Sequence, residues 1–414
     1  MQRAIVNFIF LCVVFTVSVV SAVSQSTNYS QPGPYRAGYR TVTVTRPNST
    51  TFTARLYYPA LQAGQNTPLE PAGRPYPAVT FGHGFFQAVS TYQSTLEHLA
   101  THGFFVIATN SESGIAPNHQ NFANDLRYSL TFLEQENANS TSVLFTGVAV
   151  DRFGASGHSM GGGASILATS QDTRIRALAN LAAAETNPSA KAAMPLITVP
   201  FSLPSGSTDT IVPVAINGQE MYTLGKPPKV LPVIQGGWHC GFQDSNGFGC
   251  DSGTITRPQQ LAETRRLLTS FFDLYLRRND NAIISVWGDQ LTNSLVTAQR
   301  NSGIVLLPEV QTISRMPGGD IRASITIRNL TDTSQSFKIE KAQPPRIAEL
   351  EPIITPPINP GGEHTVNIII RRQWRNAAAL SSILLAAIRV DDPLTVSFAR
   401  INLIDTYLAR DPRE

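Results

Sequence analysis

Short, continuously apolar runs alternate with segments of helical spacing between residues 76 and 276, and this alternation limits the fold more than any other feature. Continuous apolar runs are typical of strands that are buried on both faces of a parallel sheet. Strands are expected over 76–81, 104–109, 152–156, 175–182, 199–203 and 230–234, and helices over 121–136, 160–170 and 259–276. The pattern predicts an α/β fold, with a mostly parallel sheet flanked by helices and an antiparallel pair over 39–45 and 52–58 at its start.

From about residue 303 the apolar residues recur with a period of two instead. Strands are expected over 303–313, 320–330, 336–341, 364–371, 383–390 and 394–403. Several short strands separated by Pro- and Gly-rich turns are typical of a β-sandwich of the immunoglobulin-like kind. We therefore expect an α/β domain over 30–300 and a C-terminal β-sandwich domain over 303–414, with 286–300 as the junction.

The N-terminus predicts export. Arg3 precedes an uncharged apolar run over 4–20, and small residues follow up to Ala22, which is the pattern of a secretory signal peptide over 1–22. The alternative, a membrane anchor, is disfavoured because the run is short for a bilayer and polar residues follow at once. A mean hydropathy of −0.06 excludes a polytopic membrane protein, and a net charge of +3 argues against a nucleic-acid binder.

Cys240 and Cys250 are the two cysteines that remain once Cys12 leaves with the signal peptide. Two cysteines close together in an exported chain predict a disulfide, and the alternative is a pair of buried free thiols. Sequons for N-glycosylation occur at Asn28, Asn48, Asn139 and Asn329.

The pentapeptide Gly157-His158-Ser159-Met160-Gly161 is a G-x-S-x-G motif that follows an expected strand and opens an expected helix. In that context the glycines permit a sharp turn, and Ser159 is exposed on it as a nucleophile. The helix N-terminus beneath Ser159 favours the negative charge that develops on acylation.

A serine nucleophile needs a base, and the base needs a carboxylate that orients it. In this architecture the chain order is Ser, acid, His. His239 is the candidate base, because it follows an apolar strand and the only later histidine, His364, lies in the β module. The acidic residues considered between Ser159 and His239 are Asp172, Glu185, Asp209 and Glu220. Asp209 is the candidate acid, with Glu185 as the alternative, whereas Asp172 is expected at the far end of the nucleophile helix.

An oxyanion hole requires two preorganised N–H groups. We expect them from Met160, next to the nucleophile, and from Phe85 in the loop after the strand over 76–81, with Phe86 as the alternative. His83 is expected to brace this loop. Phe85, Phe86 and Trp238 are expected to form an apolar wall for the substrate, with plain core packing as the alternative. No residue spacing indicates a metal site or a phosphate-binding loop.

Together these segments resemble the α/β-hydrolase superfamily, and within it the bacterial cutinase-like and polyester hydrolases, with chlorophyllase-like and platelet-activating-factor acetylhydrolase-like esterases nearby. The resemblance covers about residues 33–300 and rests on Gly33-Pro34-Tyr35, Ala54-Arg55-Leu56-Tyr57-Tyr58-Pro59, His83-Gly84-Phe85, His102-Gly103-Phe104-Phe105-Val106-Ile107, Gly157-His158-Ser159-Met160-Gly161-Gly162-Gly163 and Asp209-Thr210-Ile211-Val212-Pro213. It implies hydrolysis of carboxylic esters through an acyl-enzyme, without a cofactor. The segment 240–250 and the β module depart from the usual pattern.

The sequence lacks a long insertion between the strands over 175–182 and 199–203, where many lipases build a lid. We therefore expect a secreted, extracellular esterase whose open site accepts ester substrates, polymeric and insoluble ones included, with no nucleic-acid partner. The alternatives are a lipase, a chlorophyllase-like esterase, or a non-catalytic binding protein on the same fold. For the β module, binding to a polymer, a surface or a protein partner stands beside a role in packing or secretion.

Overall fold

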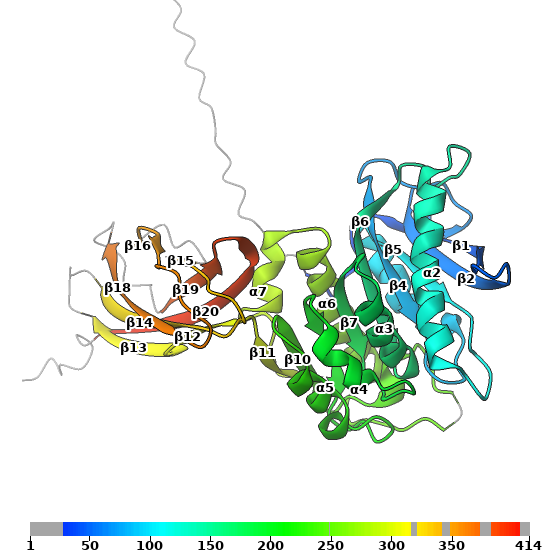
Figure 1. Ribbon diagram of the computed structural model, residues 1–414. Coiled ribbons are helices and arrows are strands. Elements are labelled where there is room, and N and C mark those ends of the chain that lie inside the picture. Colours follow the sequence, from blue (N-terminus) through cyan, green and yellow to red (C-terminus); the bar gives the residue numbers. More distant parts are fainter. Residues whose placement is uncertain (1–27, 248, 316–320, 342–347, 373–381, 406–414) are drawn as a thin grey trace, which may run out of the picture.

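The computed structural model describes residues 28–247, 249–315, 321–341, 348–372 and 382–405 (Figure 1). The expected signal peptide over 1–22 lies outside these ranges. Among the described residues, no helix has the length and apolar character needed to cross a membrane.

A large, mostly parallel sheet forms the centre of the N-terminal part, as the sequence predicts (Figure 1). Strands β5, β4, β6, β7, β8 and β10 run parallel, β1 and β2 join antiparallel at one side, and β11 pairs antiparallel with β10 at the other. The strands, in spatial order, are β11 (Val296–Asn301), β10 (Lys229–Ile234), β8 (Phe201–Ser202), β7 (Ile175–Leu181), β6 (Val148–His158), β4 (Tyr76–Gly82), β5 (Phe105–Thr109), β2 (Thr51–Ala60), β1 (Arg36–Thr45) and β3 (Gly64–Gln65), while β9 (Ser205–Gly206) pairs with β10.

Helices cover both faces of this sheet, which explains why its strands are apolar without alternation. Along β5, Phe105 and Ile107 enter one core whereas Val106 and Ala108 enter the other. The first core is closed by α2 (His119–Ala138), α3 (Met160–Gln171), α4 (Ala190–Ala193) and α5 (Gly218–Leu224), and the second by α1 (Gln93–Thr101), α6 (Arg257–Tyr275) and α7 (Ile283–Val286). The site loops leave the carboxyl ends of the parallel strands, where α/β sheets bind ligands.

Two expectations about strands need correction. The segment 286–300 is more than a junction, because β11 belongs to the large sheet and pairs with β10 along its whole length. The strand expected over 303–313 is two strands, β12 (Ile304–Leu307) and β13 (Val310–Arg315), which lie in different sheets. Pro308 stands between them, and a proline without an N–H group cannot continue the ladder.

Two smaller, mostly antiparallel sheets form a C-terminal β-sandwich (Figure 1). Apolar side chains from both sheets, Ile325 and Ile368 from one and Leu385 and Ile401 from the other, share a single core. One sheet holds β12, β14 (Ile321–Asn329), β18 (Glu363–Arg372) and β16 (Ala348–Glu349), and the other holds β13, β20 (Asp392–Asp405), β19 (Ser382–Arg389), β15 (Phe337–Lys341) and β17 (Ile353–Ile354). Asn329, in one of the sequons, is fully buried and its amide donates to the carbonyls of Thr333 and Ile358, so in the folded chain it cannot accept a glycan.

The sandwich packs against the outer helices of the large sheet. Val396 and Phe398 of β20 share an apolar cluster with Val286 and Trp287, at the end of α7. The domain boundaries expected at 300 and 303 stay predictions, because this shared cluster crosses them.

Candidate active site

Ser159 lies between the last residue of β6 and the first residue of α3, at the expected turn. Its backbone has φ 55° and ψ −122°, a strained conformation for a residue with a Cβ. Its N–H donates to the carbonyl of Leu181, and its own carbonyl accepts from Ala184, so the end of β7 holds the turn in place. A side chain at Gly161 would overlap the carbonyl of Gly82, which explains the glycine there. The elbow therefore requires a glycine in the first turn of α3, where the helix passes the end of β4.

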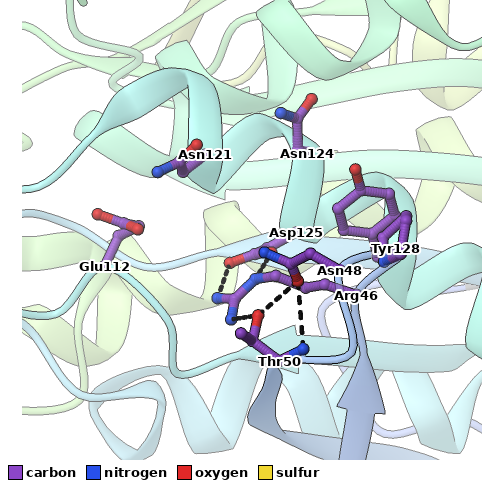
Figure 2. A pocket seen from close by; sticks show the side chains of 9 residues that line it. Arg46, Asn48, Thr50, Glu112, Asn121, Asn124, Asp125 and Tyr128 are labelled. Carbon is purple, nitrogen blue, oxygen red and sulfur yellow. Dashed lines mark hydrogen bonds and ion pairs between the residues drawn. The ribbon is translucent and has the colours of Figure 1, made fainter.

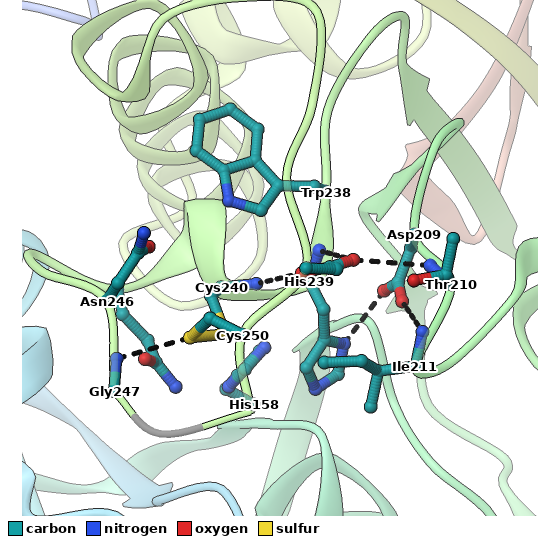
Figure 3. Close-up of a disulfide and its surroundings, with 12 residues drawn as sticks. His158, Asp209, Thr210, Ile211, Trp238, His239, Cys240, Asn246, Gly247 and Cys250 are labelled. Atoms are coloured by element: carbon teal, nitrogen blue, oxygen red, sulfur yellow. Dashed lines mark hydrogen bonds and ion pairs between the residues drawn. A yellow bond between two sulfur atoms is a disulfide. The ribbon is translucent and has the colours of Figure 1, made fainter.

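Asp209 and His239 form a buried pair at the same edge of the sheet (Figure 3). The Nδ1 atom of His239 is 2.8 Å from Oδ2 of Asp209. The other carboxylate oxygen of Asp209 accepts hydrogen bonds from the N–H groups of Ile211, at 2.9 Å, and Val212, at 2.6 Å. Because an ionised carboxylate only accepts, Nδ1 carries the hydrogen and Nε2 is left as the basic nitrogen.

The other acidic candidates have different partners. The carboxylate of Glu185 accepts from the N–H of Lys191, at 3.2 Å. Asp172 caps the far end of α3 and pairs with Arg174, at 2.6 Å, and with Arg127. Burial alone would raise the pKa of Asp172, but hydrogen bonds from Arg174 bring it below its ordinary value. Both residues are thus used in pairs that do not include His239.

The loop after β4 is braced by His83, whose ring is fully buried. Its Nδ1 lies 2.8 Å from the carbonyl oxygen of Gly84, and its Nε2 lies 2.9 Å from that of Ser111, in the loop after β5. Burial lowers the pKa of His83, against the opposing effect of the two carbonyl oxygens. His83 therefore holds two site loops together, as expected, and is not exposed for acid–base chemistry.

Tyr92, the last residue of a 3₁₀ turn over Val89–Tyr92, connects three site segments and was not expected from the sequence. Its hydroxyl oxygen accepts from the N–H of Gly84, at 3.0 Å, and from the amide of Gln243, at 3.3 Å. Burial raises the pKa of Tyr92 to about 12, so the hydroxyl stays protonated and donates to Nδ1 of His158, at 2.8 Å.

His158 is the first of the two variable residues of the G-x-S-x-G motif, and it lies beside the candidate base. Its ring centroid is 4.4 Å from that of His239, and its side chain is fully buried. Burial, followed by the nearby His239, lowers the pKa of His158 well below the ordinary value. A neutral imidazole therefore packs against His239 (Figure 3).

The aromatic residues expected as a substrate wall are placed differently. Phe85 and Phe86 are 51% and 61% exposed, whereas Trp238 is only 6% exposed. The indole of Trp238 packs under the guanidinium of Arg257, and the backbone of Gly253 passes so close that a side chain there would overlap it. The exposed part of the expected wall is therefore limited to the two phenylalanines.

Cys240 and Cys250 form the disulfide that the sequence predicts, directly after the candidate base (Figure 3). Asp251 follows the second cysteine, and its carboxylate accepts from the N–H groups of His239, Cys240 and Thr210. Nothing in the local sequence marks this residue, because its partners lie in two other segments of the chain.

A separate polar cavity of about 410 Å³ lies between the β1–β2 turn and α2 (Figure 2). The guanidinium of Arg46 donates two hydrogen bonds of 2.7 Å to the buried carboxylate of Asp125. None of the candidate catalytic residues lines it. Within the described ranges, no group of three or more His, Cys, Asp and Glu side chains is arranged to hold a metal ion.

The family comparison agrees with this geometry. The model of the PETase family, described as PET hydrolase-like, matches residues 22–252, which is more than half of the chain. Among curated proteins, none matches this chain. The matched segment includes the elbow, both loops of the Asp–His pair and the loop after β4. The chain therefore belongs to the PET hydrolase-like family, an α/β-hydrolase family of cutinase-like polyester hydrolases.

Proposed function

We propose that the protein is a secreted serine esterase that hydrolyses carboxylic esters through Ser159, His239 and Asp209 and an acyl-enzyme. The hydrogen bond of 2.8 Å between His239 and Asp209 carries this proposal, because it leaves Nε2 of a buried histidine as a free base. The strained Ser159 lies directly after β6, in the strand-to-helix turn where nucleophiles of this fold lie. An ester-hydrolase family agrees with this chemistry.

In the proposed reaction, Oγ of Ser159 attacks the ester carbonyl while Nε2 of His239 takes its proton. The N–H groups of Phe85 and Met160 then hold the oxyanion. Met160 is the first residue of α3, so its N–H has no acceptor within the helix. His239 next protonates the leaving alcohol, and water, activated by the same base, releases the acid. General-base and oxyanion contributions of about 100- to 1,000-fold each are usual for such sites.

The proposed substrates are polyesters and short- to medium-chain acyl esters. Between β7 and β8 the chain contains only α4 and a 3₁₀ turn over Met194–Leu196, so no long helix is available there as a lid. Phe85, Phe86 and Ile211, all at least 46% exposed, project from loops at the carboxyl edge of the sheet. Exposed apolar side chains around an open site suit a bulky or insoluble ester. The disulfide and the apolar N-terminus support secretion.

The test is hydrolysis of p-nitrophenyl esters, from short to long acyl chains, by the wild type and by Ser159→Ala. We expect Ser159→Ala to lose at least about 1,000-fold in kcat without loss of folding. Ser156→Ala is the matched control, because Ser156 lies on the same strand and donates only to the carbonyl of Ala179. Full activity of Ser159→Ala would refute the nucleophile, and a wild type inert on every ester would favour a non-catalytic binding protein.

The chain-length profile distinguishes the alternatives. We expect turnover of soluble esters that rises smoothly with concentration and favours short and medium chains, because the described segment between β7 and β8 has no long helix that could open at an interface. Activity that increases sharply only above the solubility limit of a long-chain ester would indicate a lipase instead.

A further inference from the structure

Asp251 connects the loop of the candidate acid to the loop of the candidate base. Its Oδ2 atom accepts hydrogen bonds from the N–H of His239, at 3.0 Å, and from the N–H of Thr210, at 3.2 Å. Its Oδ1 atom accepts from the N–H of Cys240, at 3.1 Å. Thr210 directly follows Asp209 in the sequence. Oδ2 of Asp251 therefore connects the backbone next to the candidate acid with the backbone of the candidate base, His239.

We propose that Asp251 is a positioning residue that fixes the distance between Asp209 and His239. The proposal rests on the triad proposed above and adds to it a fourth residue, with a second carboxylate, that acts on the triad and not on the substrate. Asp251 acts only through the backbone of its neighbours, because all three of its hydrogen bonds go to main-chain N–H groups.

The two loops have a second connection on the other side of the Asp–His pair. The hydroxyl of Thr208 donates to the carbonyl of Gly237, at 2.7 Å, and the N–H of Thr208 donates to the same oxygen, at 2.8 Å. Asp209 and His239 thus lie between Thr208–Gly237 on one side and Asp251 on the other. Ser207, one residue before Thr208, also joins the loops, since its hydroxyl oxygen accepts from the N–H of Gly236 at 2.8 Å. Removing Asp251 therefore leaves these hydrogen bonds, which precede Asp209 and His239 in the chain, and removes the ones that follow Asp209.

The disulfide places Asp251 for this task. Cys250 is bonded to Cys240, and Cys240 directly follows His239 in the sequence. The disulfide therefore holds Asp251, the residue after Cys250, close to His239. Without this bond the carboxylate would stand at the end of a loop of ten residues whose closure costs conformational entropy. A charged acceptor with three N–H donors is a strong group of hydrogen bonds, and its loss leaves those donors unsatisfied.

The size of the effect follows from the sensitivity of catalysis to geometry. A displacement of about 1 Å between catalytic groups can cost about 100-fold in rate. We therefore expect Asp251→Ala to lower kcat by about 30- to 100-fold with KM within about twofold, because the substrate contacts are untouched. Asp251→Asn keeps one acceptor oxygen and is expected to fall between Asp251→Ala and the wild type.

The experiment compares Asp251→Ala and Asp251→Asn with Asp244→Asn on p-nitrophenyl butyrate, with folding checked by circular dichroism. Asp244 is the matched control, because it is a partly buried aspartate inside the same disulfide loop that accepts hydrogen bonds from Ser94, away from the Asp–His pair. We expect Asp244→Asn to keep kcat within about twofold of the wild type. If Asp251→Ala or Asp251→Asn is folded and also keeps kcat within twofold, the positioning role is wrong.

A second readout separates this proposal from the proposed function. The proton shared by Nδ1 of His239 and Asp209 should give a far-downfield proton NMR resonance in the wild type. We expect this resonance to shift or broaden in Asp251→Asn and to persist unchanged in Asp244→Asn. Ser159→Ala is assayed in parallel: if it stays active, the proposed esterase mechanism fails while the resonance still reports on Asp251. An unchanged resonance in both Asp251 variants would overturn the positioning role whatever the activity of Ser159→Ala.

Discussion

The parallel-sheet part of the molecule buries five histidines together with Asp125, Asp172, Asp209, Asp273 and Lys229, whereas the described part of the C-terminal sandwich buries only Asn329, Thr355 and Thr395 as polar side chains. Buried polar groups are costly unless they are paired, and most of these are: Lys229 donates to two carbonyls and Asp273 accepts from Tyr29. The sandwich core, in contrast, is made of Ile, Leu, Val, Phe and Ala.

Buried titratable groups, of the kind that catalysis needs, thus lie in the parallel-sheet part, whereas the sandwich has an apolar core that serves packing. A fold that buries titratable groups accepts a stability cost that an apolar core avoids. Part of this set, Asp209 with His158 and His239, lies together at the candidate site, as titratable groups at functional sites do. We therefore expect changes at the candidate site residues to alter turnover, changes at the other buried titratable groups of the parallel-sheet part to alter stability, and changes in the sandwich to leave turnover unchanged.

The largest effect is expected from Asp209→Asn. An amide at this position donates toward Nδ1, so His239 is driven to the wrong tautomer while the shape of the site is kept. We expect kcat for a soluble p-nitrophenyl ester to fall by about 1,000- to 10,000-fold.

Asp172→Asn is the control, since Asp172 is a buried aspartate in the same part of the chain whose partners are Arg174 and Arg127. We expect it to lower the free energy of unfolding by about 1–3 kcal/mol and to leave kcat within about twofold. If instead Asp172→Asn abolished turnover and Asp209→Asn did not, the acid would have been assigned wrongly.

Sequence patterns predict most of the parallel-sheet part, because strands covered on both faces must be apolar along their whole length. They fail where that condition fails. Strand β11 lies at the edge of the sheet and carries Gln299, Arg300 and Asn301, so it has the composition of a loop. Helix α1 is missed because its buried face includes Thr95 and His98 beside its leucines.

The candidate site shows the same contrast. Ser159 and Met160 carry a local motif, and Asp209 and His239 can be proposed from chain order and elimination. Tyr92 and Asp251 carry no local signal, because each acts on backbone or side-chain atoms in segments far along the chain: Tyr92 meets His158 and Gln243, and Asp251 meets Thr210. Only the folded arrangement shows that these residues belong to the site.

An effect of intermediate size is expected from His98, whose contribution to the free energy of unfolding should depend on pH. His98 is buried on α1 and donates to the carbonyl of Tyr29, and burial, followed by the nearby His102, lowers its pKa to about 3. Below the ordinary histidine value the unfolded chain binds a proton that the folded chain does not, so stability falls as pH falls from about 6.5 toward 3. At pH 5 this amounts to about 2 kcal/mol.

The measurement is urea unfolding at pH 7 and at pH 5. We expect His98→Gln to lose less stability than the wild type between the two pH values, by about 2 kcal/mol, because glutamine keeps a donor but does not titrate. His364→Gln is the control, since His364 lies on β18 of the sandwich and is only partly buried. If both variants lost equally less stability than the wild type between pH 7 and pH 5, His364 of the sandwich would contribute as much to the loss of stability in acid as His98.

The smallest effect on turnover is expected from removing the sandwich. Among the described residues, no hydrogen bond or ion pair joins it to the loops that carry Ser159, Asp209 and His239; it contacts the end of α7 through Val396 and Phe398. A chain ending at residue 302 should therefore keep kcat for a soluble ester within about twofold, although it melts at a lower temperature because Trp287 loses its apolar cover.

Full-length Phe398→Ala tests the same contact if the shortened chain does not fold. A loss of turnover beyond tenfold in either variant would tie the sandwich to the chemistry, whereas a loss of adsorption to a polyester film at unchanged kcat would give it a role in holding the enzyme on solid substrate.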